Sequence, residues 1–91
     1  MIDAEDAELL QAKGEIFREL RIASGSTSYA SFASTHRLDR RHYERIEEGQ
    51  NMGATYVLRI TKIHSISMSD YYKMVEKRIA ENRMKKINSN K

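Results

Sequence analysis

Scarcity of helix-breaking residues is the feature that most constrains what this chain can fold into. Its 91 residues include no proline and only 4 glycines. These two residues are the most costly in a helix interior, and the turns of β-sandwiches and barrels depend on them. The sequence therefore predicts an all-α protein. A chain of this length supports one good hydrophobic core, so we expect a single domain that spans residues 1–91.

Apolar residues recur at spacings of three and four, which predicts a compact bundle of about five short helices. The expected helices cover residues of about 4–24, 28–35, 40–48, 54–64 and 70–84. The side chains expected to face the core are Leu9, Ile16, Phe17, Leu20, Ala23, Phe32, Ala33, Tyr43, Ile46, Val57, Leu58, Ile60, Thr61, Ile63, Tyr71, Tyr72, Val75 and Ile79. Gly14 weakens the first helix, so we expect the part before it to fray or separate. The core of the domain is expected at about residues 14–72, and the polar residues 85–91 are expected to fray.

Glycines and short polar residues predict where these helices begin and end. Gly25 and Gly49 each follow the last residue of an apolar stripe, where glycine is a natural C-terminal stop. Asp39 is the expected N-cap of the third helix, because its carboxylate accepts bonds from open backbone N–H groups. Residues 36–38 form the turn between the second and third helices, with Leu38 as its apolar plug.

Positive charge gathers in two segments, although the net charge is only +3. Residues 36–45 contain four arginines against two acids, and residues 73–91 contain seven Lys or Arg against two acids. Basic clusters of this kind attract phosphate, but a solvated helix face explains the second cluster equally well. Residues 1–15 are acidic by contrast. Elsewhere, Glu47 is expected to pair with an arginine of the first helix, such as Arg21.

Several classes of protein and of site are disfavoured. The sequence has no cysteine, which excludes disulfide frameworks, thiolate metal sites and thiol catalysis. It has no apolar run of about 18 residues and no signal peptide at its acidic start, so we expect a soluble, cytoplasmic protein that does not enter membranes. His36, His42 and His64 make a poor zinc set, and no nucleophile, base and oxyanion site assembles. We therefore expect no metal, no cofactor and no enzymatic activity.

Short pieces along the chain match, in order and spacing, those of a known family. The pieces are Leu20-Arg21, Gly25, Phe32-Ala33, Leu38-Asp39, residues 43–49, Leu58-Arg59-Ile60 and residues 66–71. The most specific piece is Arg45-Ile46-Glu47-Glu48-Gly49. On these pieces, residues 16–72 resemble the phage-repressor, or Xre (Cro-type), helix-turn-helix family. The resemblance implies a lambda-repressor-like fold with a central helix-turn-helix. It also implies a bacterial or phage-type transcriptional regulator that acts by occupying an operator in double-stranded DNA.

Two positions depart from the family pattern. Family members usually have glutamine at the start of the second helix, where it holds a phosphate, whereas this sequence has Tyr29. A tyrosine hydroxyl also donates to phosphates. Many members have glycine in the turn between the two motif helices, whereas His36 and Arg37 stand here. We therefore expect one of these two residues to adopt a strained backbone conformation.

The third helix carries the expected recognition surface. Arg40, Arg41 and Arg45 are the first, second and sixth residues after the N-cap, so they face away from the core. The arginine fork matches O6 and N7 of guanine, which favours half-sites that contain G·C pairs. The alternative is that some of these arginines only touch phosphate or pair with nearby glutamates. The candidate DNA-binding residues are Ser28, Tyr29, Arg37, Arg40, Arg41, Glu44, Arg45, Gln50 and Asn51.

A single small module reads few base pairs, so we expect a homodimer on a two-fold-symmetric site. The candidate dimerisation element is the helix of about 70–84, where Val75, Ile79 and Met84 extend an apolar stripe. The competing account is that this helix folds back over its own core and leaves a monomer that dimerises only on DNA. The alternative function is a protein-interaction module of the same fold, such as an antitoxin-like partner that binds another protein.

Overall fold

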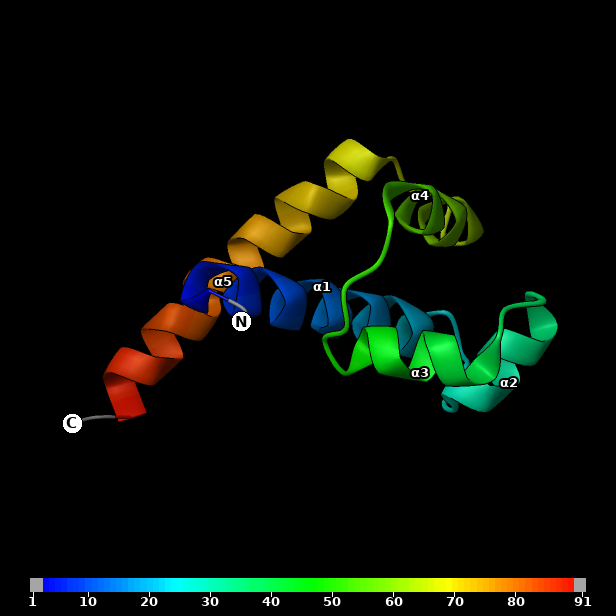
Figure 1. The fold of residues 1–91 in the computed structure, drawn as a ribbon, viewed down its shortest axis with the longest axis horizontal. Coiled ribbons are helices and arrows are strands. Elements are labelled where there is room, and N and C mark those ends of the chain that lie inside the picture. Colours follow the sequence, from blue (N-terminus) through cyan, green and yellow to red (C-terminus); the bar gives the residue numbers. More distant parts are fainter. Residues whose placement is uncertain (1–2, 90–91) are drawn as a thin grey trace.

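Helices account for 77% of the computed structural model, which describes residues 3–89. The elements in chain order are α1 (Ala4–Ala23), α2 (Tyr29–Thr35), α3 (Arg40–Glu47), α4 (Ala54–Ile63) and α5 (Met68–Ser89). No strand is present between residues 3 and 89, and the helices form a compact globule (Figure 1). The prediction of an all-α chain with five helices is confirmed. None of these helices is both long enough and apolar enough to cross a membrane.

The helix ends follow the capping residues of the sequence. The Asp39 carboxylate accepts a hydrogen bond from the backbone N–H of His42 at 2.8 Å, as predicted. Gly25 and Gly49 adopt φ angles of 97° and 101° after α1 and α3, a conformation that glycine reaches without a steric penalty. Both predicted stops are confirmed. The fifth helix begins at Met68, two residues earlier than predicted. The Ser67 hydroxyl caps it by accepting a hydrogen bond from the backbone N–H of Asp70 at 2.9 Å.

The buried apolar side chains form one cluster to which all five helices contribute. Its members are Ala12, Ile16, Phe17, Phe32, Ala33, Leu38, Tyr43, Ile46, Met52, Val57, Ile60, Tyr71 and Val75. The apolar spacing also places Leu9, Ala23 and Leu58 in the core, and this is wrong, because all three are exposed, Leu9 by 37% and Leu58 by 41%. Val57 and Ile60 take the inward positions of α4, and the buried face of α1 begins only at Ala12.

Gly14 lies where α1 and α3 approach each other most closely. The helix continues through it without a break, so the prediction that the segment before Gly14 frays or separates is wrong. A Cβ atom at this position would lie 2.6 Å from the carbonyl oxygens of both Ile46 and Glu47. Those oxygens belong to the backbone and cannot move aside as a flexible side chain would. The missing side chain therefore sets the distance between the two helices.

We expect Gly14→Ala to destabilise the protein by about 1–3 kcal/mol. Alanine raises the intrinsic helix propensity by about 1 kcal/mol, but the added methyl group forces α3 away from α1. Urea unfolding followed by circular dichroism measures the change. Gly53→Ala is the control without a steric clash, because no atom lies within 4 Å of a Cβ there and its φ is −74°, and any loss at this N-cap position reflects capping alone. A Gly14→Ala variant that is as stable as the wild type would contradict the close approach.

The first half of α5 completes the core by packing against α1. The ring of Tyr71 stacks on Phe17 with centroids 4.4 Å apart, and its hydroxyl donates to the backbone carbonyl of Lys13 at 3.1 Å. Val75, one turn further along, is fully buried. Val75 is therefore part of the core of its own chain. The prediction that it contributes to a dimer interface is wrong. In this respect α5 folds back as the competing account expects.

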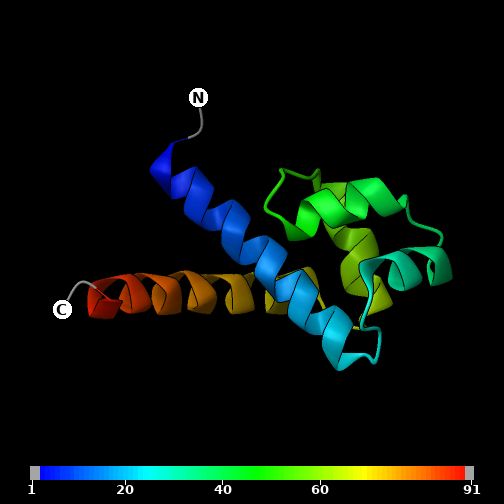
Figure 2. The ribbon, with the colours of Figure 1, turned by 90° about the horizontal axis from the view of Figure 1, so that it is seen from below.

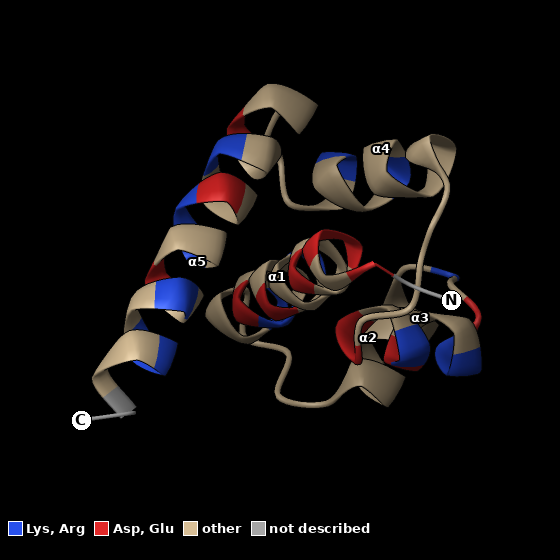
Figure 3. Cartoon of the chain, turned by 60° about the vertical axis from the view of Figure 1, so that its left-hand side comes forward, with Lys and Arg blue, Asp and Glu red and all other residues tan. Residues whose placement is uncertain are grey.

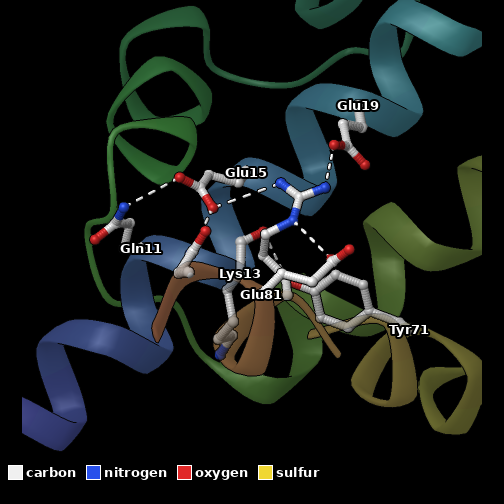
Figure 4. A network of polar contacts seen from close by, with 8 residues as sticks. Gln11, Lys13, Glu15, Glu19, Tyr71 and Glu81 are labelled. Atoms are coloured by element: carbon white, nitrogen blue, oxygen red, sulfur yellow. Dashed lines mark hydrogen bonds and ion pairs between the residues drawn. The ribbon is translucent and has the colours of Figure 1, made fainter. Parts of the chain in front are cut away.

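Ion pairs join the second half of α5 to α1. Arg78 pairs with Glu15 and Glu19, and Arg83 pairs with Glu8 at 2.7 Å. Figure 3 shows acidic positions on α1 and Lys or Arg positions along α5, and Figure 4 shows the contacts of Glu15 and Glu19. Acidic residues near the start of the chain and basic residues near its end therefore pair with each other. Two arginines of the C-terminal basic cluster, Arg78 and Arg83, form ion pairs within the molecule.

Beyond these pairs α5 continues as a helix to Ser89. The prediction that residues 85–91 fray is therefore wrong for residues 85–89, and residues 90–91 lie outside the described part of the chain. Met84 and Ile87, one turn apart on this segment, are exposed by 57% and 56%. The described ends of α1 and α5 nearest the termini both lie on the side of the molecule away from α2 (Figure 2).

Candidate nucleic-acid interface

The connection between α2 and α3 is short, and contacts from Leu38 below and Arg59 of α4 stabilise it. Leu38 is buried beneath it, and its backbone N–H donates to the carbonyl of Ala33 at 2.8 Å. Arg37 has a φ of 56°, which confirms that one residue of the turn adopts the left-handed conformation that glycine favours. The guanidinium of Arg59, on α4, donates to the Arg37 carbonyl at 3.0 Å. This bond and the buried Leu38 fix the turn, and with it the start of α3.

One face of α3 is buried and the opposite face is open. Tyr43 and Ile46 are fully buried, and the Tyr43 ring lies 5.1 Å from that of Phe32, between centroids. The side chains of Arg40, Arg41 and Arg45 are exposed, as the sequence predicts. Figure 3 shows Lys and Arg positions in blue on α3. We call these three side chains the arginine face.

A buried ion pair joins α3 to α1. Nε and Nη2 of Arg21 donate to the two carboxylate oxygens of Glu47 at 2.7 Å and 3.0 Å, and its Nη1 donates to the Ser26 carbonyl at 2.8 Å. The two side chains are only 5% and 7% exposed. The hydrogen bonds to Glu47 raise the pKa of Arg21 above its ordinary value. The predicted pairing of Glu47 with Arg21 is confirmed, and it fixes the rotation of α3 on the rest of the molecule.

A second polar contact joins α2 to the open side of α3. The Tyr29 hydroxyl donates to Oε1 of Glu44 at 2.9 Å. This bond to a carboxylate raises the pKa of Tyr29, and the positive charge of Arg40 nearby acts in the opposite direction. The hydroxyl that the sequence offers to a phosphate is therefore engaged inside the protein. No sequence spacing predicts this contact, because the two residues lie 15 positions apart on different helices.

Two hollows flank the arginine face, and Arg40 and Glu44 line both of them. The larger has a volume of 580 Å³ and lies between α1, the start of α2 and α3. Its lining residues are Arg18, Arg21, Thr27, Ser28, Tyr29, Ala30, Arg40, Glu44, Glu47 and Glu48. The smaller, of 420 Å³, is lined by Asp39, Arg40, Arg41 and Glu44. Side chains of both charge signs line each hollow.

The structure brings some of the predicted site residues together and leaves others apart. Ser28 caps α2, where its hydroxyl accepts from the backbone N–H of Ser31 at 3.1 Å, and it lies with Tyr29 beside the arginine face. Gln50 and Asn51 are exposed but follow the far end of α3, about 12 Å of helix from its start. Arg18 on α1 is an exposed residue of the larger hollow that the sequence did not single out, because it lies before the two helices and the turn of the predicted helix-turn-helix, residues 28–48.

All three histidines pack against aromatic rings. The ring of His64 stacks on Phe32 at 5.3 Å, and His36 contacts the same ring at 4.5 Å, both between centroids. Burial lowers the pKa of His64, and the nearby His36 lowers it further. His42 lies edge-on to Tyr56 at 4.6 Å. Between residues 3 and 89, no three His, Asp or Glu side chains are grouped so that they could hold a metal ion.

Comparison of the chain with models of protein families, with curated proteins and with solved structures gave no match. The candidate site therefore stands on its own geometry. That geometry consists of an exposed arginine face, a buried ion pair that orients it, and a tyrosine whose hydroxyl donates to Glu44, one turn from Arg40 and Arg41.

Proposed function

We propose that the protein binds double-stranded DNA in a sequence-specific way and regulates transcription by occupying an operator. In this proposal α2, the turn and α3 form a helix-turn-helix, and α3 is the recognition helix. The observation that carries the proposal is the exposed arginine face of a helix whose opposite side is buried at Tyr43 and Ile46 and held by the ion pair of Glu47 with Arg21. A solvated surface helix has no need of a fixed rotation, whereas a recognition helix must present the same side chains to every site.

The arrangement of charges supports α3 over α5 as the DNA-binding element. Arginines of α5 such as Arg78 and Arg83 pair with acids of α1. No ion pair between residues 3 and 89 involves Arg40, Arg41 or Arg45 within 4.0 Å. Arg40 lies close enough to Tyr29 to affect its pKa, but no carboxylate of the described residues holds any of the three guanidinium groups, so they can turn to guanine edges or phosphates. Arg40 and Arg41 lie on the first turn of α3, which is the part of a recognition helix that reaches base edges.

Other exposed residues of the candidate set would contact the DNA backbone. Ser28 at the start of α2, Arg37 in the turn, and Gln50 and Asn51 after α3 all project from segments next to the recognition helix. Polar side chains in such positions fix the register of a protein on the duplex but do not read sequence. The resemblance to the phage-repressor family favours the same division of roles.

Binding to duplex DNA should weaken steeply as salt is added. Contacts to about four to six phosphates per protomer give a log–log slope between about −3.6 and −5.4, because each neutralised phosphate contributes about −0.9. Fluorescence anisotropy of a labelled duplex at several salt concentrations measures this slope. Arg37→Ala should reduce its magnitude by about 1, whereas Lys77→Ala on α5 should leave it unchanged. A flat profile would contradict DNA binding and favour the protein-interaction alternative.

We propose further that two copies of the chain bind one two-fold-symmetric site, with half-site centres about 34 Å apart. The contact surface would be the exposed stripe of Met84 and Ile87 near the end of α5. This segment lies on the side of the molecule away from α2 (Figure 2), so a partner seated there leaves the start of the helix-turn-helix open. Large apolar side chains that are more than half exposed lose contact with water in such an interface.

Light scattering of the protein without DNA, at tens of micromolar, should give the mass of a dimer. Replacing both Met84 and Ile87 with lysine should give a monomer with an unchanged fold, since neither side chain belongs to the core. Leu58→Lys on α4 is the control, because it removes another exposed large apolar side chain, 41% exposed, from a different helix. A monomeric wild type would contradict a dimer that forms without DNA. Two copies would then associate only when both are bound to DNA.

A further inference from the structure

Glu44 is the acid shared by the two hollows of the candidate interface, since Asp39 lines only the smaller hollow and the other glutamates only the larger. Glu44 lies one turn from both Arg40 and Arg41 on α3, and it lines both hollows beside the arginine face. A carboxylate in this position is repelled by phosphates, so it weakens non-specific attraction to the duplex. The Tyr29 hydroxyl donates to it at 2.9 Å, and the remaining acceptor capacity of the carboxylate suits a second donor from outside the protein. In the major groove of DNA that donor is an exocyclic amino group.

The Tyr29 hydroxyl restricts where the Glu44 carboxylate can be. The hydroxyl belongs to another helix, and it binds Oε1 at 2.9 Å. Both side chains are half-buried, so neither moves as freely as an exposed surface chain. An ionised carboxylate accepts about four hydrogen bonds, so the bond from Tyr29 leaves most of its capacity for a donor in solution. A charged acceptor held still beside an arginine is the arrangement that direct readout of a base pair requires.

We propose that Glu44 is a specificity-determining residue that accepts a hydrogen bond from the N4 amino group of cytosine, and that Tyr29 is the residue that positions it. The inference rests on the proposed function and adds the base and the pair of residues that read it. Arginine forks match guanine, and carboxylates accept from cytosine N4. Arg40 and Glu44, side by side, therefore select for guanine at one position of the half-site and for cytosine at another.

The test uses the full chain and a duplex that the wild type selects from a random pool. Each position of that duplex is changed in turn to the other three base pairs, and dissociation constants are measured for every change. The wild type should prefer cytosine at one position by about tenfold or more. Glu44→Gln should move this preference from cytosine to adenine and leave the other positions unchanged, because a glutamine amide pairs with N6 and N7 of adenine.

Tyr29→Phe tests the positioning role. It removes one hydroxyl and keeps the ring, so the melting temperature should stay near that of the wild type. The preference for cytosine should fall several-fold at the same position and nowhere else. In a Glu44→Ala background, Tyr29→Phe should have no further effect, because Tyr29 acts only through that carboxylate. Tyr56→Phe on α4, which removes a hydroxyl outside both hollows, is the matched control and should not alter any preference.

The outcomes separate this inference from the proposed function. If Glu44→Gln leaves every preference unchanged, Glu44 does not read a base and the inference is overturned, while the proposed function stands. If Tyr29→Phe weakens all duplexes alike, Tyr29 contacts a phosphate and has no positioning role, which also overturns the inference. If the wild type selects no sequence from the pool, the proposed function fails and the inference fails with it.

Discussion

Arg21→Met is expected to destabilise the protein by about 3–5 kcal/mol, because it leaves the carboxylate of Glu47 buried without its partner. In the wild type this carboxylate accepts two hydrogen bonds from Arg21, and both side chains are less than 10% exposed. Burying an unpaired charge costs far more than the pair itself contributes. The loss should therefore be a large part of the stability of a domain of this size.

Urea or thermal unfolding measures this loss, and the chain offers a matched control. Arg83→Met breaks an ion pair of similar geometry between Arg83 and Glu8, but this pair is exposed, so it should cost no more than about 1 kcal/mol. The double replacement of Arg21 by Met and Glu47 by Leu should recover much of the lost stability, since no charge remains buried. If Arg21→Met costs no more than Arg83→Met, the ion pair does not hold α3 in place.

Arg40→Ala and Arg41→Ala are each expected to remove discrimination at one position of the selected DNA site. The loss should be about 1–3 kcal/mol at that position, the value of one bidentate contact between arginine and guanine. Neither side chain belongs to the buried cluster, so both variants should fold as the wild type does. Competition of the selected duplex against single-position variants measures the effect.

Arg37→Ala separates base contacts from phosphate contacts. Arg37 lies in the turn before α3, so it should contribute to affinity without reading sequence, and its loss should weaken all duplexes alike. If Arg40→Ala and Arg41→Ala also weaken all duplexes alike, the arginine face contacts only phosphate. DNA binding would then stand, but the assignment of α3 as the helix that reads sequence would be wrong.

Local features of the sequence predict most helix ends and the buried side of α3. Gly25, Gly49 and Asp39 act through backbone conformation and short-range hydrogen bonds, which depend little on the rest of the fold. The pairing of Arg21 with Glu47 was predictable as well. Glu47 is near the end of a helix on the side that faces α1, and a buried carboxylate needs a positively charged partner. These predictions held because each depends on few residues.

Other features depend on how the helices pack, and spacing alone does not predict them. Leu9 and Leu58 fit an apolar stripe, but no neighbouring helix covers them. Val75 fits a stripe that could face either a partner or its own core, and only the close packing of α5 on α1 decides between these. The contact of Tyr29 with Glu44 depends on the angle between α2 and α3, which the turn at residues 36–39 sets.

Selection of bound sequences from a random pool of duplexes tests the central claim most directly. The protein is mixed with the pool, bound duplexes are recovered and sequenced over several rounds, and Arg40→Ala/Arg41→Ala is treated in parallel. The account predicts that the wild type enriches one motif that contains G·C pairs, repeated as two half-sites about 34 Å apart, and that the double variant loses this enrichment. Recovery of no enriched motif with the wild type, or of the same motif with both proteins, would contradict it.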